Sequence, residues 1–265
     1  MRGLVTQWSL AALIFASLAG CASAPKPEGS TAPPSLTTAL MPLAVSPGEG
    51  DDLTALMVPY RAEVAKLDVP FTESLADFEH KRRDGPLASW VADALRAGLS
   101  MRMGKPIDIY VQNGGGLRAP LAAGPVSYST ILKVLPFENF VVAIPMSGKD
   151  VVALAAKLTE MKGNCGISGM AIEGTADYKL TSVTVGGAPH PLARTYLVGV
   201  DTFIAGGGSG FEMLTAFKYE NSKALVRDLA FDFAKAEAAA GRRIAMPENP
   251  FRFRFGGKTI KEITP

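Results

Sequence analysis

Three short segments of this 265-residue sequence combine glycine, phenylalanine and polar residues at spacings that suit ligand binding. The first is Asn113–Arg118, Asn-Gly-Gly-Gly-Leu-Arg, which directly follows a short apolar run. Its glycines let backbone N–H groups approach a ligand without a Cβ in the way, and Arg118 offers a planar set of donors for phosphate or carboxylate. A tight turn followed by a solvated arginine has the same sequence, so this segment alone leaves both interpretations open.

The second segment is Leu135–Asn139, in which Phe137 stands between a proline and polar residues. An exposed phenylalanine here would stack on a base, whereas a core phenylalanine is the more common alternative. The third segment is Phe203–Phe211, with four glycines at positions 206, 207, 208 and 210. It lacks the features of a nucleophile elbow, a dinucleotide fingerprint or a phosphate-binding P-loop. A ligand-binding loop and a flexible connection both remain open for it.

Composition excludes several classes of protein. The net charge of +2, from 27 basic and 25 acidic residues, argues against a nucleic-acid binder, and 48% hydrophobic residues permit a sizeable core. The two histidines, His80 and His190, are too few and too isolated for a histidine-rich metal site, so we expect surface or loop positions. Cys165 has no intrachain partner once Cys21 is modified; burial is favoured over a nucleophilic role.

The N-terminus resembles a bacterial lipoprotein leader. An apolar run of 12 residues at 8–19, too short to span a bilayer, ends just before Cys21. We therefore predict a signal peptide over 1–20, lipidation of Cys21, a Pro- and Ser-rich tether over 21–50 and one domain over 51–265. An ordinary secretory signal is the alternative. The predicted location is the cell envelope, lipid-anchored to the outer membrane and facing the periplasm.

Hydrophobic periodicity predicts the elements that carry these segments. Apolar stripes indicate helices over 53–67 and 87–99, the second after a possible Asp84-Gly85-Pro86 cap, and Ser147 can cap a helix running to Met161. A longer helix is predicted over about 222–241. Strands are predicted over 107–111, 140–145, 178–185, 196–200 and 251–255. This irregular order predicts an α+β fold with a mixed sheet flanked by helices.

Taken in order, the three segments resemble the C-terminal domain of the 5'-nucleotidases, which are secreted or periplasmic two-domain enzymes. The resemblance extends over about residues 52–265. It implies that two aromatic rings hold the base of a nucleotide, and Phe137 and Phe203 stand at the matching positions. Asn113, Arg118 and Asn139 match polar contacts of the family.

The resemblance also implies a phosphate contact before the second helix. Lys81 matches an arginine of the family there, and Arg83 is the nearest alternative; a solvated charge run is the other interpretation. Ser209 departs from the family pattern, because it stands where a carboxylate accepts hydrogen bonds from ribose hydroxyls. This change implies either weaker nucleotide binding or a ligand without a free ribose diol. Gly206 is a second departure, since asparagine is common there.

The metal-binding patterns of the family's hydrolytic domain are not found in the sequence. We therefore expect no catalytic residue and no cofactor in this chain; a dinuclear metal site would have to come from a partner. Three hypotheses follow: a nucleotide- or nucleoside-binding lipoprotein, the substrate-binding half of a split hydrolase with a separate metallophosphoesterase, or a non-binding structural envelope protein.

Overall fold

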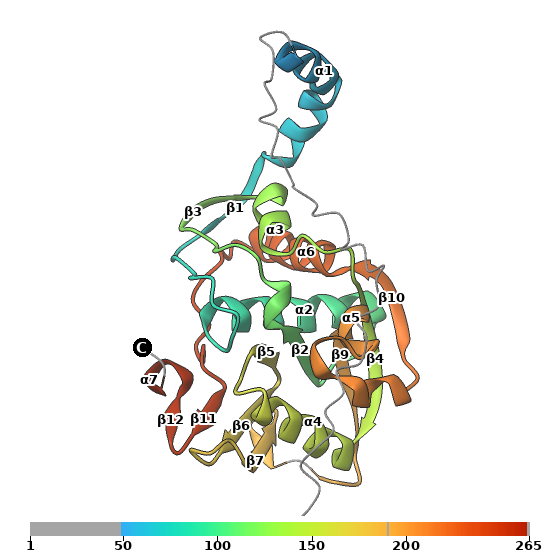
Figure 1. The fold of residues 1–265 in the computed structure, drawn as a ribbon, viewed down its shortest axis with the longest axis vertical. Coiled ribbons are helices and arrows are strands. Elements are labelled where there is room, and N and C mark those ends of the chain that lie inside the picture. Colours follow the sequence, from blue (N-terminus) through green and yellow to red (C-terminus); the bar gives the residue numbers. More distant parts are fainter. Residues whose placement is uncertain (1–48, 190, 264–265) are drawn as a thin grey trace, which may run out of the picture. The chain divides into compact units, whose positions relative to one another are not determined.

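A computed structural model describes residues 49–189 and 191–263 of the chain (Figure 1). The predicted signal peptide, Cys21, most of the tether and His190 therefore lie outside the described residues. Residues from Asp51 onward form one compact unit. Within the described part of the chain, no helix is both long enough and apolar enough to cross a membrane.

The first helix, α1, spans Glu49–Leu67 and confirms the predicted helix near 53–67. Its apolar stripe is not part of the core, however. Leu56, Tyr60 and Val64 are each more than half exposed. Helical spacing of apolar residues predicts which side chains share a face, and that face remains uncovered here.

A five-stranded mixed sheet, the central sheet, carries the three segments. Its strand order is β10-β4-β9-β2-β5. Strands β2 and β9 run parallel and the other neighbours antiparallel. The strands are β2 (Ile109–Asn113), β4 (Phe140–Ser147), β5 (Cys165–Ser168), β9 (Thr195–Asp201) and β10 (Glu220–Leu225).

A second five-stranded sheet has the order β12-β11-β6-β7-β8, and β1 pairs with β3 in a separate two-stranded ribbon. The second sheet is also mixed, because β11 runs parallel to β6. Its strands are β6 (Met170–Gly174), β7 (Leu180–Val185), β8 (Ala188–Pro189), β11 (Phe253–Phe255) and β12 (Lys258–Thr259). The ribbon consists of β1 (Pro70–Ser74) and β3 (Gly124–Ser127).

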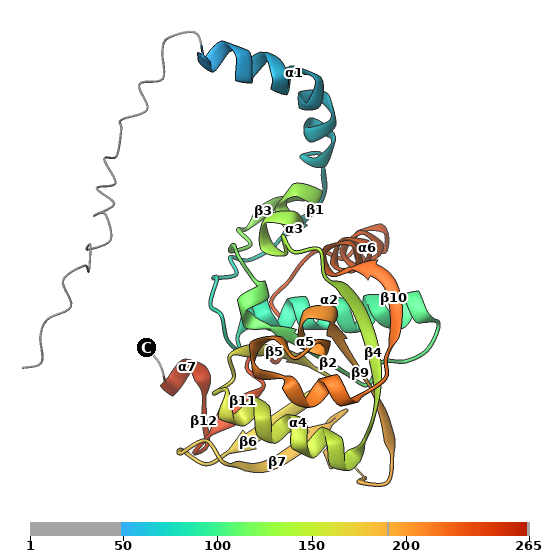
Figure 2. The same ribbon diagram turned by 45° about the vertical axis from the view of Figure 1, so that its right-hand side comes forward.

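Helices cover both faces of the central sheet (Figure 2). Alternate residues of β4 divide between the two faces, as the period of a strand requires. Val141 and Ala143 pack with α2 and α6, whereas Val142 and Ile144 pack with α4 and the second sheet. The helices are α2 (Pro86–Met103), α3 (Tyr128–Val134), α4 (Gly148–Glu160), α5 (Thr202–Ala205), α6 (Val226–Ala239) and α7 (Ile260–Ile263). The single 3-10 turns are η1 (Gly114–Gly116), η2 (Gly208–Gly210) and η3 (Glu212–Ala216).

The α+β prediction is confirmed, with two mixed sheets where one was expected. The predicted cap at Ser147 is confirmed as well, because its hydroxyl and Asp150 form a reciprocal capping box. The long helix predicted from about 222 is wrong at its start. Residues 220–225 instead form β10, which pairs with β4, and α6 begins at Val226.

The predicted cap of α2 is also wrong in one detail. Pro86 occupies the first turn as expected, but Gly85 is the N-cap residue and no side chain caps the helix. The Asp84 carboxylate instead accepts hydrogen bonds from the backbone N–H groups of Arg252 and Phe253, at 2.8 and 3.1 Å. Asp84 therefore holds the start of β11 against the start of α2.

Candidate functional site

Strand order brings the three segments to the same edge of the central sheet. Asn113–Arg118 leaves the carboxyl end of β2, and Phe203–Phe211 leaves the carboxyl end of the parallel neighbour β9. Leu135–Asn139 enters β4, which is antiparallel to β9, with Val141 paired to Asp201. The carboxyl ends of adjacent parallel strands are a common place for ligands.

The glycine turn after β2 is built around the Asn113 side chain. Its Oδ1 accepts a hydrogen bond from the backbone N–H of Gly115 at 3.0 Å and so caps the turn. No described residue accepts a hydrogen bond from the Asn113 Nδ2 group, so this donor is free for a ligand. Gly114 must be glycine, because a Cβ there would lie 2.4 Å from the backbone oxygen of Arg82.

Arg118 and Phe137 lie together at one side of the site. The Arg118 guanidinium carbon is 5.5 Å from the centre of the Phe137 ring, a cation–π arrangement. No described carboxylate forms an ion pair with Arg118. Phe137 itself is 44% exposed, so its ring is not a core ring, although that is the more common alternative for this segment.

A half-buried arginine on α6, Arg227, fixes the Phe137 loop. The Arg227 guanidinium donates hydrogen bonds to the backbone oxygens of Pro136 and Phe137, at 3.3 and 3.5 Å. It also pairs with the Glu138 carboxylate at 3.0 Å. Sequence analysis did not identify Arg227, because nothing in its local sequence indicates a contact some 90 residues away.

Asn139 and Asp201 connect the second segment to the third. The Asn139 side chain lies near the Asp201 carboxylate and favours its charged form, and Asp201 Oδ1 caps α5 by accepting the N–H of Ile204 at 2.9 Å. Burial raises the pKa of Asp201, despite the hydrogen bonds that favour its charged form. A small cavity of about 10 Å³, close to the volume that holds one water, lies between Asn139, Asp201 and Gln112. The Oε1 atom of Gln112 is buried there without a hydrogen-bond partner.

Phe203 lies on α5 and is 46% exposed. Its ring lies directly over Gly208, where an added Cβ would stand 2.5 Å from the ring atom Cζ. Glycine at this position therefore lets the ring lie flat against the backbone. Among the described residues, neither Phe203 nor Phe137 packs against another aromatic ring.

Ser209 has a left-handed backbone conformation, φ 56°, which non-glycine residues seldom adopt. Its hydroxyl donates a hydrogen bond to Asn113 Oδ1 at 3.3 Å and so joins the first and third segments. Phe211, completely buried, anchors the end of this loop in the core. Such backbone strain is commonly found at functional sites.

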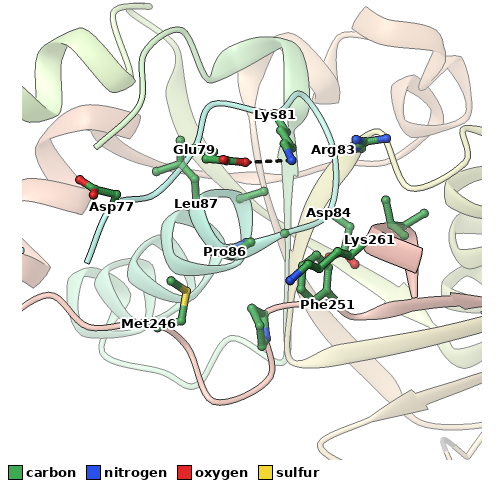
Figure 3. Close-up of a pocket in the computed structure, with 14 residues that line it drawn as sticks. Asp77, Glu79, Lys81, Arg83, Asp84, Pro86, Leu87, Met246, Phe251 and Lys261 are labelled. Atoms are coloured by element: carbon green, nitrogen blue, oxygen red, sulfur yellow. Dashed lines mark ion pairs between the residues drawn. The ribbon is translucent and has the colours of Figure 1, made fainter. Parts of the chain in front are cut away.

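The structure places Lys81 and Arg83 in a different cavity from Phe137 and Asn139 (Figure 3). This larger cavity, about 570 Å³, lies at the start of α2. The Lys81 ammonium pairs with the Glu79 carboxylate at 2.8 Å, whereas Arg83 forms no ion pair with a described residue. The backbone at Arg82, between these two residues, passes directly beside Gly114 of the first segment.

Asp84 lies at the bottom of the larger cavity and is 1% exposed. Burial raises its pKa to about 7 and outweighs the hydrogen bonds from the backbone of Phe253, Arg252 and Gly85. Its Oδ1 has no hydrogen-bond partner of normal geometry among the described residues. This carboxyl group therefore titrates near neutral pH, between its protonated and its charged form.

The surroundings of Cys165 and His80 do not indicate a role in catalysis or metal binding. Cys165 is buried, as predicted, and burial raises the pKa of its thiol, which disfavours a nucleophilic thiolate. His80 lies in a loop, half-buried, with Nε2 2.7 Å from the backbone oxygen of Leu117. No group of three or more His, Cys, Asp or Glu side chains within 49–189 and 191–263 is arranged to hold a metal ion.

Comparison with known proteins identifies the family of the chain. Residues 63–216 match the family described as "5'-nucleotidase, C-terminal domain". The chain belongs to this family. It is 39% identical to Protein UshA of Salmonella pullorum over 111 residues, which cover 39% of this chain and 20% of UshA. It is 31% identical to a 5'-nucleotidase of Vibrio cholerae over 136 residues, 49% of this chain and 24% of that enzyme.

The fold agrees with that of solved members of the family. The crystal structure of a 5'-nucleotidase precursor from Thermus thermophilus superposes with a TM-score of 0.64 at 23% identity, covering 78% of this chain and 43% of that protein. The chain thus spans about a fifth to a quarter of the length of the curated relatives it matches.

Proposed function

We propose that this chain binds a nucleotide or nucleoside by holding its base between the rings of Phe137 and Phe203. The observation that carries the proposal is that two phenylalanines, 44% and 46% exposed, lie on segments that meet at one edge of the central sheet. Exposed aromatic rings supported by fixed backbone are suited to stacking on a base, which contributes about 1–3 kcal/mol per base.

The polar groups around the two rings suit the rest of such a ligand. Asn113 and Asn139 supply side-chain amides, and Ser209 supplies a hydroxyl. Arg118 supplies a guanidinium with no carboxylate partner among the described residues, which suits a phosphate. We assign the phosphate end of a longer ligand to Lys81 and Arg83 in the larger cavity at the start of α2.

We further propose that the chain is held at the bacterial cell envelope by lipidation of Cys21 and does not hydrolyse its ligand alone. Cys21 follows the apolar leader directly. Hydrolysis would use metal ions that generate and direct the nucleophile, and the described residues offer no cluster of ligands for them.

A second candidate function is the substrate-binding half of a split hydrolase. This possibility is favoured by the coverage of the relatives, since the chain matches only 20% of UshA. A separate metallophosphoesterase would then supply the remaining chemistry.

Calorimetry with the full chain in detergent tests the proposal against adenosine, AMP and UDP-glucose. Binding should weaken by about fivefold or more in Phe137→Ala and remain unchanged in Tyr219→Ala, which removes another exposed aromatic ring. Absence of binding heat for every ligand would reject the proposal and favour a structural envelope protein.

A phosphate-release assay with Mn²⁺, Co²⁺ or Zn²⁺ separates the two candidates. Release by the chain alone would overturn the claim that it does not hydrolyse nucleotides. Release only after addition of a metallophosphoesterase would favour the split hydrolase.

A further inference from the structure

One cation beside the third segment has no assigned role. Lys157 lies on α4, and its side chain lies against Gly210, the residue after Ser209. The position that a Gly210 Cβ would occupy is 3.5 Å from Lys157 Nζ and 3.7 Å from Lys157 Cε. Gly210, with φ +83° and no side chain, leaves the space that the lysine occupies.

The Lys157 ammonium has no partner within the described part of the chain. It forms no ion pair and donates no hydrogen bond to a described residue, although the residue is half-buried. A lysine in the last turn of a helix is favoured by the helix dipole. The dipole does not explain why the end of the side chain lies on the glycine loop.

Ser209 and Lys157, at this end of the site, both carry hydrogen-bond donors. Ser209 carries a neutral hydroxyl that donates to Asn113, and Lys157 carries a positive charge. Sugar hydroxyls are bound well by a carboxylate that accepts two hydrogen bonds. A hydroxyl beside an ammonium instead suits an anionic group, because both can donate to its oxygens.

The loop holds these two donors in fixed positions. Phe211 is completely buried in the core that α4 also lines, so Gly210 and Lys157 are attached to the same packed unit. The Ser209 hydroxyl is tied to Asn113 in the first segment. The loops of the site therefore carry two cations, Arg118 beside Phe137 and Lys157 beside Gly210.

We infer that the ligand is a nucleotide carrying a phosphate on its ribose ring, at the 2' or 3' oxygen, and that Lys157 and Ser209 bind this phosphate. The inference rests on the proposed function: the Phe203 ring lies over Gly208, the neighbour of Ser209, so a sugar attached to a base on this ring would lie beside the third segment. Recognition of a ribose phosphate distinguishes this site from one that selects a free ribose diol.

Calorimetry with the full chain in phosphate-free buffer compares AMP, adenosine 3',5'-bisphosphate and adenosine 2',5'-bisphosphate. One bisphosphate should bind about tenfold more tightly than AMP, as one additional charge-assisted contact predicts. The 2' and 3' isomers show which oxygen carries the phosphate. Equal affinity of all three ligands would overturn the inference.

Substitutions on α4 and in the third segment provide a second test of the inference. Lys157→Met should remove the preference for the bisphosphate, and Lys157→Arg should retain most of it. Ser209→Asp, which adds a carboxylate at a backbone conformation that aspartate tolerates, should reverse the preference in favour of AMP. Lys149→Met, an equal loss of charge at an exposed position of the same helix, should leave both affinities unchanged.

The outcomes separate the two proposals. If no adenine nucleotide binds, the proposed function fails and this inference fails with it. If AMP binds as proposed but Lys157→Met leaves the bisphosphate preference intact, or no such preference exists, the inference alone is rejected.

Discussion

The Ser209 hydroxyl donates a hydrogen bond to Oδ1 of Asn113 over 3.3 Å, and these two residues are 96 positions apart in the sequence. The same Oδ1 accepts the backbone N–H of Gly115 at 3.0 Å. One side-chain oxygen therefore shapes the turn after β2 and ties it to the loop after β9.

Asn113→Ala should destabilise the protein more than Ser209→Ala does. Asn113→Ala leaves the N–H of Gly115 without its cap, a loss of about 1 kcal/mol. Ser209→Ala removes only one hydrogen bond at an exposed residue, and we expect a loss below about 0.5 kcal/mol. Urea denaturation of the two single variants and the double variant measures both effects and their coupling. Equal losses in the single variants would contradict the role of Asn113 as the cap of the turn.

Gly208→Ala should weaken nucleotide binding with little change in stability. The new Cβ would stand 2.5 Å from the Phe203 ring, so this exposed ring must swing away from its position. A displaced ring no longer forms one side of the base site, and we expect a loss of about 1 kcal/mol or more in binding. Calorimetry with AMP measures the affinity, and thermal unfolding measures stability.

Gly206→Ala is the matched control for this prediction. It adds a Cβ in the same loop, where the nearest atom outside adjacent residues is the Thr202 backbone oxygen at 3.2 Å and the Phe203 ring is not touched. Its affinity for AMP should stay close to that of the parent chain. An equal loss of affinity in both variants would show that loop rigidity, rather than the ring position, is responsible.

The sequence predicts the three segments of the site better than the distant side chains that contact them. The three segments and the apolar strands beside them can be located from the sequence, because glycine content and apolar runs are local properties. Arg227 and Lys157 could not be predicted. Each acts on a loop about 50 to 90 residues away, at Phe137 and Gly210, and such contacts depend on how helices pack on the sheet.

The errors at β10 and Asp84 have the same physical origin. Residues 220–225 could extend the following helix, but pairing with β4 satisfies their backbone and makes them an edge strand. Asp84 has the sequence context of a helix cap, yet its carboxylate accepts hydrogen bonds from the backbone N–H groups of Arg252 and Phe253 instead. In both cases a partner distant in the sequence overrides the local preference.

Arg118→Met should lower affinity for AMP more than affinity for adenosine. Without its guanidinium, the site loses a charge-assisted contact to phosphate, a loss of about 1.5–3 kcal/mol. The binding free energy of adenosine should fall by only about 0.5–1 kcal/mol, because adenosine loses only the cation–π contact by which the guanidinium holds the exposed Phe137 ring. Calorimetry of both ligands checks this. Arg102→Met, on α2, is a matched control, and equal losses for AMP and adenosine would contradict the assigned role of Arg118.

The stability of the protein should depend on pH through Asp84. Its pKa is about 7 in the folded chain, against 3.8 for a free aspartate. Between these values the folded state holds a proton that the unfolded state has lost. The contribution of Asp84 to the free energy of unfolding therefore falls as pH rises through this range, by at most about 1.4 kcal/mol per pH unit, and levels off above about pH 7.

Asp84→Asn removes this titration while keeping the shape of the side chain, and its oxygen can still accept from the backbone of Arg252 and Phe253. The free energy of unfolding of the variant, minus that of the parent chain, should therefore increase as the pH rises from 5 to 8. Urea denaturation at each pH measures this difference. Asp177→Asn is the control. Hydrogen bonds from Thr175 and Lys179 lower the pKa of exposed Asp177, so its titration is complete below pH 5 and the effect of its replacement should be constant across this range. A constant difference for Asp84→Asn as well would contradict a buried carboxyl group that titrates near neutrality.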